Sequence, residues 1–243
     1  MKDWQLKQIL TGNSIGRRGT APHICYTPVS MTNGDLLQPS REREPRWPAL
    51  LALLAVIGLY LGLPDFLTFG HTWLLIFVLL VAAVALFATH RTGRHDLNHN
   101  LGIAVNGLTT GMMVGSVALL IKALPEHKEA PGALLRSASA LWITNILVFA
   151  AWYWRLDAGG PHQRSLRSHH HEGAFLFPQM TMRHGTWSPQ FVDYLFLAFN
   201  TSTALSPADT QALSRWAKLL MMAQALISLT IIVLLVARSV NIM

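Results

Sequence analysis

Five long apolar segments dominate this sequence and limit the folds that it can adopt. A helix that crosses a membrane needs about 17–25 mostly apolar residues, and the segments that meet this length are about 48–67, 72–89, 101–123, 134–154 and 212–237. Only 13% of the residues are charged, about half the share found in a typical soluble protein. The sequence therefore predicts an all-α fold, a polytopic transmembrane helix bundle with five spans.

Two domains follow from the change in composition near residue 46. Residues 1–46 are rich in Gly, Pro, Ser, Thr and Arg and cannot bury enough apolar surface to fold alone. We expect residues 1–46 to form a disordered cytoplasmic tail, with Met31 as an alternative start, and residues 47–243 to form the transmembrane domain. The single Cys25 excludes an internal disulfide framework and a Cys-rich metal site.

The Lys and Arg residues lie between the apolar segments rather than along one face, so topology explains the net charge of +7 better than nucleic-acid binding does. They gather before the first segment, after the second and after the fourth, where Arg155 follows Trp154 as an interfacial anchor. Cytoplasmic loops of membrane proteins carry an excess of Lys and Arg. We therefore expect a multi-pass protein of the bacterial inner (plasma) membrane with a cytoplasmic N-terminus.

A sixth, shorter apolar stretch precedes the last long segment. Ser188-Pro189 is typical of a helix start, so we expect a helix from about Pro189 to Phe199 and a last helix that begins near Pro207. The short helix either crosses the membrane as a thin sixth span or enters and returns as a re-entrant loop that lines a pore. The residues at this polar break are Asn200, Thr201, Ser202, Thr203 and Asp209.

Three glycines recur at every fourth position of the third segment: Gly107, Gly111 and Gly115. Small residues on one face let transmembrane helices approach closely. This stripe predicts helix packing, either within one bundle or between copies in a homo-oligomer.

Histidines are concentrated in the two loops that we expect on the cytoplasmic side. His95 and His99 are four residues apart, with Asp96 beside them, and His169, His170 and His171 follow the fourth segment. Such residues could hold a zinc-like ion or respond to acid. Because polar loops also collect histidines without a function, we expect no metal, and these five are weak candidates.

The C-terminal third, from Phe177 to Ile242, resembles the end of a bacterial family of multi-pass membrane proteins described only as a domain of unknown function, number thirteen forty-five. The matching residues are Phe177-Pro178, Asp193-Tyr194, Phe196, Phe199, Thr201 to Thr203, Ser206, Asp209 and Arg215. In this chain two residues separate Ser206 from Asp209, which departs from the family's Ser-Asp step. The resemblance implies an architecture and no activity. The same stretch is similar in order to the pore half of tetrameric cation channels, although it lacks the filter glycines.

No nucleophile–base pair, phosphate loop or dinucleotide fingerprint occurs, so we expect neither an enzyme nor a cofactor. The function that we expect is a channel or transporter for ions or small solutes. The alternatives are a structural or partner-binding membrane protein that transports nothing, and a pH or metal sensor that uses the histidine loops. The expected partners are the lipid bilayer and further copies of the chain.

Overall fold

The computed structural model describes residues 47–64, 67–68, 72–123, 131–166, 173–181, 187–203 and 210–240. The chain divides into two compact units, Met1–Arg41 and Glu42–Met243, and every described residue belongs to the second unit. The expected disordered tail and the alternative start Met31 therefore lie outside the described residues.

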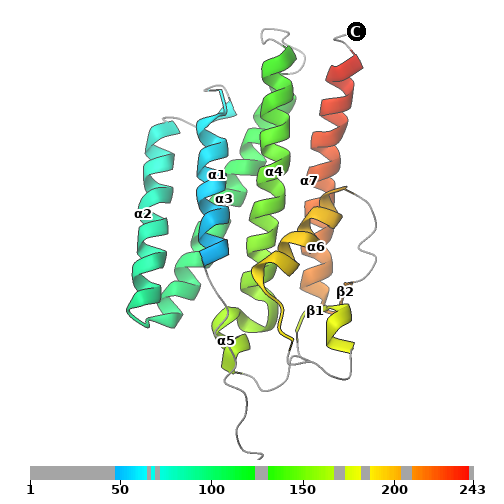
Figure 1. The fold of residues 1–243 in the computed structure, drawn as a ribbon. Helices are drawn as coiled ribbons and strands as arrows, with labels where there is room; N and C mark the ends of the chain where they lie inside the picture. Colours follow the sequence, from blue (N-terminus) through cyan, green and yellow to red (C-terminus); the bar gives the residue numbers. More distant parts are fainter. Residues whose placement is uncertain are drawn as a thin grey trace, which may run out of the picture. The chain divides into compact units, whose positions relative to one another are not determined.

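Each of the five apolar segments contains a helix (Figure 1). These helices are α1 (Trp47–Leu61), α2 (Thr72–Arg91), α3 (His95–Ala123), α4 (Pro131–Leu156) and α7 (Arg215–Val240). The shorter elements are η2 (Asp157–Gly159), α5 (Pro161–Leu166), β1 (Phe175–Leu176), η3 (Pro178–Thr181), α6 (Phe191–Thr203) and β2 (Gln211–Ala212). The all-α class is confirmed, because the two strands contain only two residues each.

Three helices, α3, α4 and α7, are long and apolar enough to cross a membrane. The shorter apolar helices are α1 and the part of α2 from Ile76 to Arg91. The expected helical span 48–67 is too long, since α1 ends at Leu61 and a turn follows at Gly62. Pro64 explains this end, because proline disfavours a helical conformation in the residue before it. The helix lengths therefore support three membrane crossings and do not establish five.

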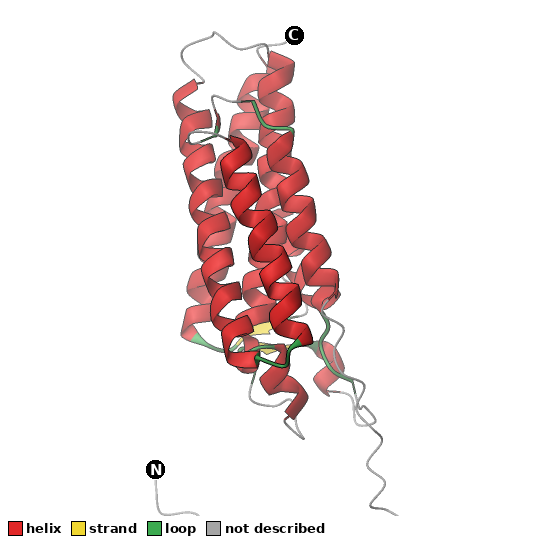
Figure 2. Ribbon diagram, turned by 90° about the vertical axis from the view of Figure 1, so that its left-hand side faces the viewer, coloured by secondary structure: helices red, strands yellow, loops and turns green. Residues whose placement is uncertain are grey.

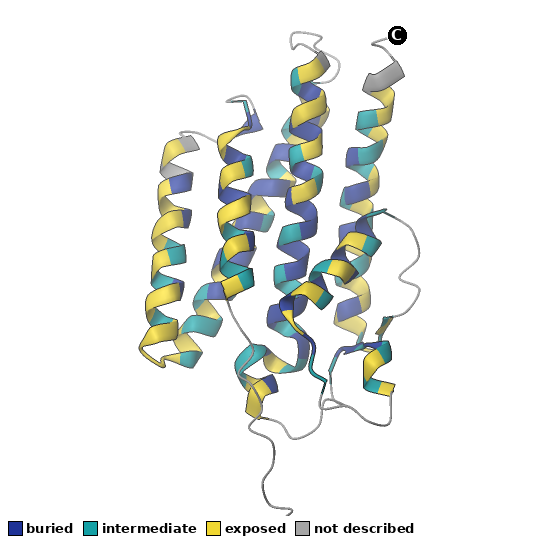
Figure 3. Cartoon of the chain, viewed as in Figure 1, coloured by how far each residue is buried: buried dark blue, intermediate teal, exposed yellow. Residues whose placement is uncertain are grey.

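Many large apolar side chains are exposed on these helices, and Figure 3 shows the exposed parts of each helix. Along α7, exposed side chains recur every three or four residues, and Leu226 among them is 65% exposed. They are Leu219, Met222, Leu226, Leu229, Val233 and Val236. An apolar stripe of this length is costly in water and stable against lipid tails. The surface is consistent with a membrane protein.

Helix α4 is the centre of the packing, because it contacts α1, α3, α6 and α7. Figure 2 shows the long helices running along a common direction, with the small sheet near one end. One buried apolar cluster joins α1, α2, α3 and α4, and a second joins α4, α6, α7 and β1. The first group, α1 to α4, is called the four-helix unit below.

Helix α6 does not cross this bundle from end to end. Strand β1 precedes α6 and strand β2 follows it, and the two pair antiparallel, with Phe175 opposite Ala212. The chain before α6 and the chain before α7 therefore lie at the same end of the bundle, which is the end where α4 finishes (Figure 1). Helix α7 then runs to the opposite end of the bundle (Figure 1).

A buried cluster fastens α6 to the end of α4. The Asp157 carboxylate accepts hydrogen bonds from the Ala174 backbone N–H at 2.5 Å and from the Tyr194 hydroxyl at 2.6 Å. Arg164 donates through Nη1 to the carbonyls of Trp154 (2.7 Å) and Asp157 (2.9 Å). Because Arg164 occupies the last carbonyls of α4, it serves as a C-terminal cap of that helix.

The start of α6 lies within two residues of the expected Pro189, whereas the expected start of α7 near Pro207 is wrong. Helix α6 begins at Phe191, after the Gln190 N–H donates to the Asp193 carboxylate at 2.7 Å, so Gln190 is the cap in place of Ser188. Helix α7 begins at Arg215 rather than near Pro207, because residues 211–212 pair with β1. The Ser214 hydroxyl then caps α7 by accepting from the Ala217 N–H at 3.2 Å. Ser206, Pro207 and Asp209 lie outside the described residues.

Candidate functional site

A polar cavity of about 360 Å³ opens where α3 begins, α4 ends and α5 follows. Its lining combines imidazoles, amides and one residue of each charge. These residues are His95, Asp96, Asn98, His99, Asn100, Arg155, Gly159, Pro161, His162 and Gln163. We call it the polar vestibule. Gly160 sets the turn into α5 with a φ of +93°, and a Cβ there would lie 2.9 Å from the Arg155 carbonyl oxygen.

Arg155 forms the inner wall of the polar vestibule. Its side chain is only 9% exposed, and Nη1 donates to the Asn98 carbonyl at 3.2 Å. The guanidinium lies directly over Gly102 of α3, where any Cβ would overlap Nη1, Cζ and Nη2. The interpretation of Arg155 as an interfacial anchor is therefore wrong: the side chain turns inward because Gly102 leaves room for it.

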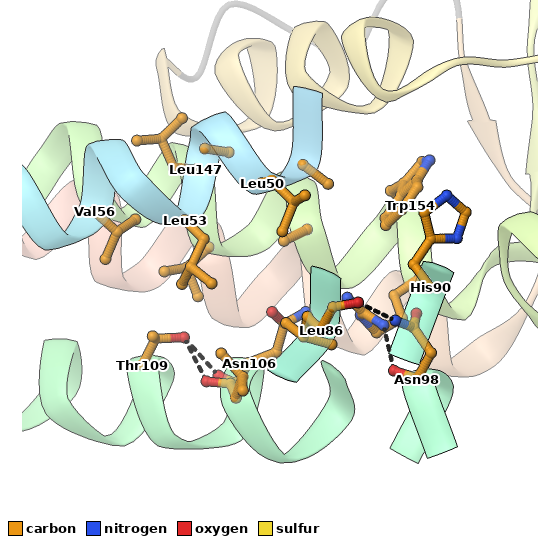
Figure 4. Close-up of a pocket in the computed structure, with 16 residues that line it drawn as sticks. Leu50, Leu53, Val56, Leu86, His90, Asn98, Asn106, Thr109, Leu147 and Trp154 are labelled. Atoms are coloured by element: carbon orange, nitrogen blue, oxygen red, sulfur yellow. Dashed lines mark hydrogen bonds between the residues drawn. The ribbon is translucent and has the colours of Figure 1, made fainter. Parts of the chain in front are cut away.

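A second cavity, of about 50 Å³, lies within the four-helix unit (Figure 4). Most of its wall is apolar, with Leu50, Leu53 and Val56 of α1 opposite Asn106 and Thr109 of α3. Arg155 and Asn98 line both this inner cavity and the polar vestibule. The two cavities are therefore neighbours that share a wall containing a guanidinium.

Asn106 contributes to the lining of the inner cavity. The residue is 7% exposed, and its Nδ2 is buried with no hydrogen-bond partner within the part of the chain that the structure describes. Thr109, one turn further on, donates to the carbonyls of Val105 and Asn106, both at 3.0 Å. A buried amide donor without a partner is costly.

The expected metal candidates are only partly brought together. His95 and His99 both line the polar vestibule, and the His95 ring stacks on His162 with centroids 3.7 Å apart. No group of three or more His, Cys, Asp or Glu side chains able to hold a metal occurs among the described residues. His169, His170 and His171 lie outside them.

The polar-break residues fall inside α6 and at its end rather than in a break, since the helix continues to Thr203. Thr201 donates to the Leu197 carbonyl at 2.9 Å, and Thr203 to the Phe199 carbonyl at 3.1 Å. Asn200 is exposed. None of the residues from Asn200 to Thr203 lines either cavity, and Asp209 lies outside the described residues.

Ser202 belongs to a buried polar network that joins α4, α6 and α7. The Gln224 amide donates to the Ser202 hydroxyl and to the Ala198 carbonyl, both at 2.7 Å, and accepts from the Tyr153 hydroxyl. Ser228 donates to the Ser202 carbonyl at 2.6 Å. These contacts are the interhelical hydrogen bonds that polar residues at membrane depth form. The network holds α6 in place and encloses no described cavity.

Two glycines of the stripe, Gly107 and Gly111, make no close contact with the described residues. Gly107 and Gly111 are exposed, and a Cβ built on either would meet no atom within 4 Å. Gly115 is half-buried. The packing interpretation within one bundle is therefore wrong for Gly107 and Gly111. The glycine on α3 that does mediate a close contact is Gly102, which lies outside the four-residue repeat.

Sequence reasoning identified two members of this site without their roles. Asn106 is a polar residue within the third apolar segment, so the sequence predicts that it faces inward, because polar groups that face lipid are costly, and it does. Arg155 was expected to be an anchor at the membrane interface. The one sequence signal against this is Gly102, a glycine of the third apolar segment that lies five residues before the stripe. Only the packing of α3 on α4 connects them.

Comparison with known proteins adds no relative. No family model matches the chain, and no curated protein or solved structure matches it significantly. The resemblance of the segment from Phe177 to Ile242 to a family of unknown function therefore stays a prediction. What the chain does must be inferred from the vestibule, the inner cavity and Arg155 between them.

Proposed function

We propose that this chain is an integral protein of the bacterial inner membrane that binds small anions and moves them across it. In this proposal α1, α2, α3, α4 and α7 each cross the membrane and α6 is re-entrant. Helix α2, with 20 residues, would be about 30 Å long, which matches the hydrocarbon core. Helix α1, with 15 residues, would be about 22 Å long, so the turn after it would complete the crossing.

The distribution of cations supports a cytoplasmic position for the end of the bundle that holds the polar vestibule. Arg91, Arg94, Arg155 and Arg164 belong to this end, and the pairing of β1 with β2 adds Arg215 and Lys218 at the start of α7. The opposite end has Lys122 on α3, Arg136 on α4 and Arg238 near the end of α7. Since cytoplasmic loops carry the excess of Lys and Arg, the N-terminus and the vestibule would be cytoplasmic, and the C-terminus periplasmic.

The observation that carries the proposed activity is the position of Arg155. Its guanidinium is charged at all physiological pH values and is shared by a polar cavity at the bundle end and an apolar cavity inside it. Among the described residues, none that lines the inner cavity is acidic, and Asp96 is the one acidic residue in the lining of the vestibule. A buried cation between two cavities attracts anions and repels cations, because charges act more strongly where water is excluded.

Chloride flux in proteoliposomes tests this function. The parent protein should release chloride from loaded vesicles, and Arg155→Gln should lower the initial rate about 10- to 100-fold, the loss expected for one charged hydrogen bond. Arg136→Gln is the matched control, because it removes the same charge from an exposed position at the other end of α4. Equal chloride flux through the parent, Arg155→Gln and empty vesicles would refute the proposal.

The vestibule also supports acid regulation of the same site, which is the sensor alternative. His95 and His99 of α3 and His162 of α5 line it together with Asp96 and Arg155. Imidazoles gain positive charge as the pH falls, so anion binding should strengthen in acid. Burial and the nearby Arg155 lower the pKa of His99, so its charge appears only in more acid solution than that of a free imidazole. A chloride flux that rises between pH 7.5 and 5.5 in the parent, and stays level in His95→Gln/His162→Gln, would support it. A level profile in both proteins would exclude it.

A further inference from the structure

Two cations and a long apolar stripe share one face of α7. Arg215 and Lys218 in the first turn of the helix are exposed, and the exposed apolar stripe from Leu219 to Val236 begins directly after them. Residues three, four and seven positions apart lie on the same side of a helix, so both cations stand at one end of the stripe. That end of α7 lies beside the small sheet (Figure 1).

We infer that this face of α7 binds one anionic phospholipid, with its phosphate against Arg215 and Lys218 and its acyl chains along the apolar stripe. The inference rests on the membrane location in the proposed function and is independent of anion transport. The lipid would come from the leaflet on the side of the polar vestibule, because α7 begins at that end of the bundle.

The length of the apolar stripe fits a lipid of one leaflet. The part of α7 from Lys218 to Leu229 is about 16 Å long at about 1.5 Å per residue. One leaflet contributes about half of a hydrocarbon core that is about 30 Å thick. Acyl chains that start at the two cations would therefore end near Leu229, and Val233 and Val236 would face the other leaflet.

The charge of this face selects the headgroup. No acidic residue occurs in α7, so no carboxylate on this helix neutralises Arg215 or Lys218. Lys and Arg near a membrane surface attract anionic lipids. Phosphatidylglycerol carries a net negative charge, whereas the choline of phosphatidylcholine balances its phosphate. The face should therefore prefer the anionic lipid.

The same cations argue against a second copy of the chain as the occupant. Copies of a membrane protein have the same orientation in the bilayer, so a two-fold dimer through this face would bring Arg215 and Lys218 of both copies to the same level. Like charges across an interface are unfavourable. The apolar stripe also favours a lipid over free phosphate, because only acyl chains can make van der Waals contacts along it.

Native mass spectrometry of the full-length protein tests the site, in detergent micelles that contain phosphatidylglycerol or phosphatidylcholine. The parent should bind one phosphatidylglycerol more tightly than phosphatidylcholine, and Arg215→Gln/Lys218→Gln should weaken this binding about 10- to 30-fold. Lys122→Gln/Arg136→Gln is the matched control, because it removes two exposed cations from the opposite end of the bundle. It should bind like the parent, and equal affinities of the two double variants would overturn the inference.

A measurement on the parent protein keeps the test independent of variant folding. Phosphatidylglycerol with a photoreactive acyl chain should label α7 between Leu219 and Leu229, and labelling confined to other helices would contradict the site. Two further outcomes would also overturn the inference. One is displacement of the lipid by an equal concentration of inorganic phosphate. The other is disulfide-linked dimers of Cys25→Ser/Leu226→Cys in membranes, which would show that a second copy covers the face.

The lipid site and the transport activity fail separately. Arg155→Gln should keep the tight phosphatidylglycerol adduct, because Arg155 belongs to α4 and lines the polar vestibule. Chloride flux without a lipid preference would refute the lipid site alone, and a lipid preference without chloride flux would refute anion transport alone.

Discussion

The contact between Gly102 and Arg155 predicts that a single methyl group will disable the site. In Gly102→Ala the new Cβ would overlap three atoms of the guanidinium, Nη1, Cζ and Nη2, each at less than 2.5 Å. Carbon atoms in proteins approach favourably only to about 3.5–4.0 Å. Because α3 and α4 are packed helices, the guanidinium at the end of a flexible side chain should move rather than the backbone.

The magnitude follows from the distance that the guanidinium must move, which is at least about 1 Å. The hydrogen bond from Nη1 to the Asn98 carbonyl is already 3.2 Å long, and this shift would carry it beyond hydrogen-bond distance. Loss of a hydrogen bond from a charged donor costs about 1.5–3 kcal/mol. We expect a comparable loss in the free energy of unfolding, and a fall in chloride flux like that of Arg155→Gln.

Thermal unfolding in detergent and chloride flux in proteoliposomes measure the two effects. Gly107→Ala is the matched control on the same helix, because a Cβ there meets nothing within 4 Å. In an Arg155→Ala background, Gly102→Ala should have little further effect on either quantity, since the group that it displaces is gone. The reasoning is refuted if Gly102→Ala melts and conducts like Gly107→Ala.

Three further predictions concern the rest of the fold. Gln224→Leu removes the amide that joins Ala198, Ser202 and Tyr153, so it should lower the free energy of unfolding by about 1–3 kcal/mol. The control is Thr230→Val on the same helix, which should change this free energy little, because the Thr230 hydroxyl bonds to its own helix backbone. Equal melting of the two variants would contradict this role of the network. Gly111→Leu should leave the free energy of unfolding of the monomer unchanged, because the position faces open space. Cross-linking should show fewer dimers only if the glycine stripe joins copies of the chain. A destabilised monomer would contradict the open position. A C-terminal alkaline phosphatase fusion should be active, because α7 ends opposite the end where α1 begins (Figure 1), and fluorescence from a C-terminal green fluorescent protein would instead place the C-terminus in the cytoplasm.

The apolar segments determined most of the secondary structure, because a run of about 20 apolar residues has few stable alternatives to a buried or lipid-facing helix. All five segments contain helices, and the inward position of Asn145, Gln224 and Ser228 followed from the cost of polar groups facing lipid. Local signals were weaker at the ends. Pro189 and Pro207 indicated helix starts, but capping by Gln190 and pairing of Gln211 moved the starts along the chain.

The site itself was decided by the tertiary structure. Arg155 at the end of an apolar segment is typical of an interfacial anchor, and nothing in the sequence indicates that Gly102, 53 positions earlier, leaves room for its guanidinium. The position of α6 beside α4 and α7 likewise depends on two two-residue strands that pair across about 35 residues of chain. A sequence pattern indicates which residues share one face of a helix, whereas a cavity depends on which helix faces pack against each other. For this reason the helices could be predicted from composition, and the contact that builds the site could not.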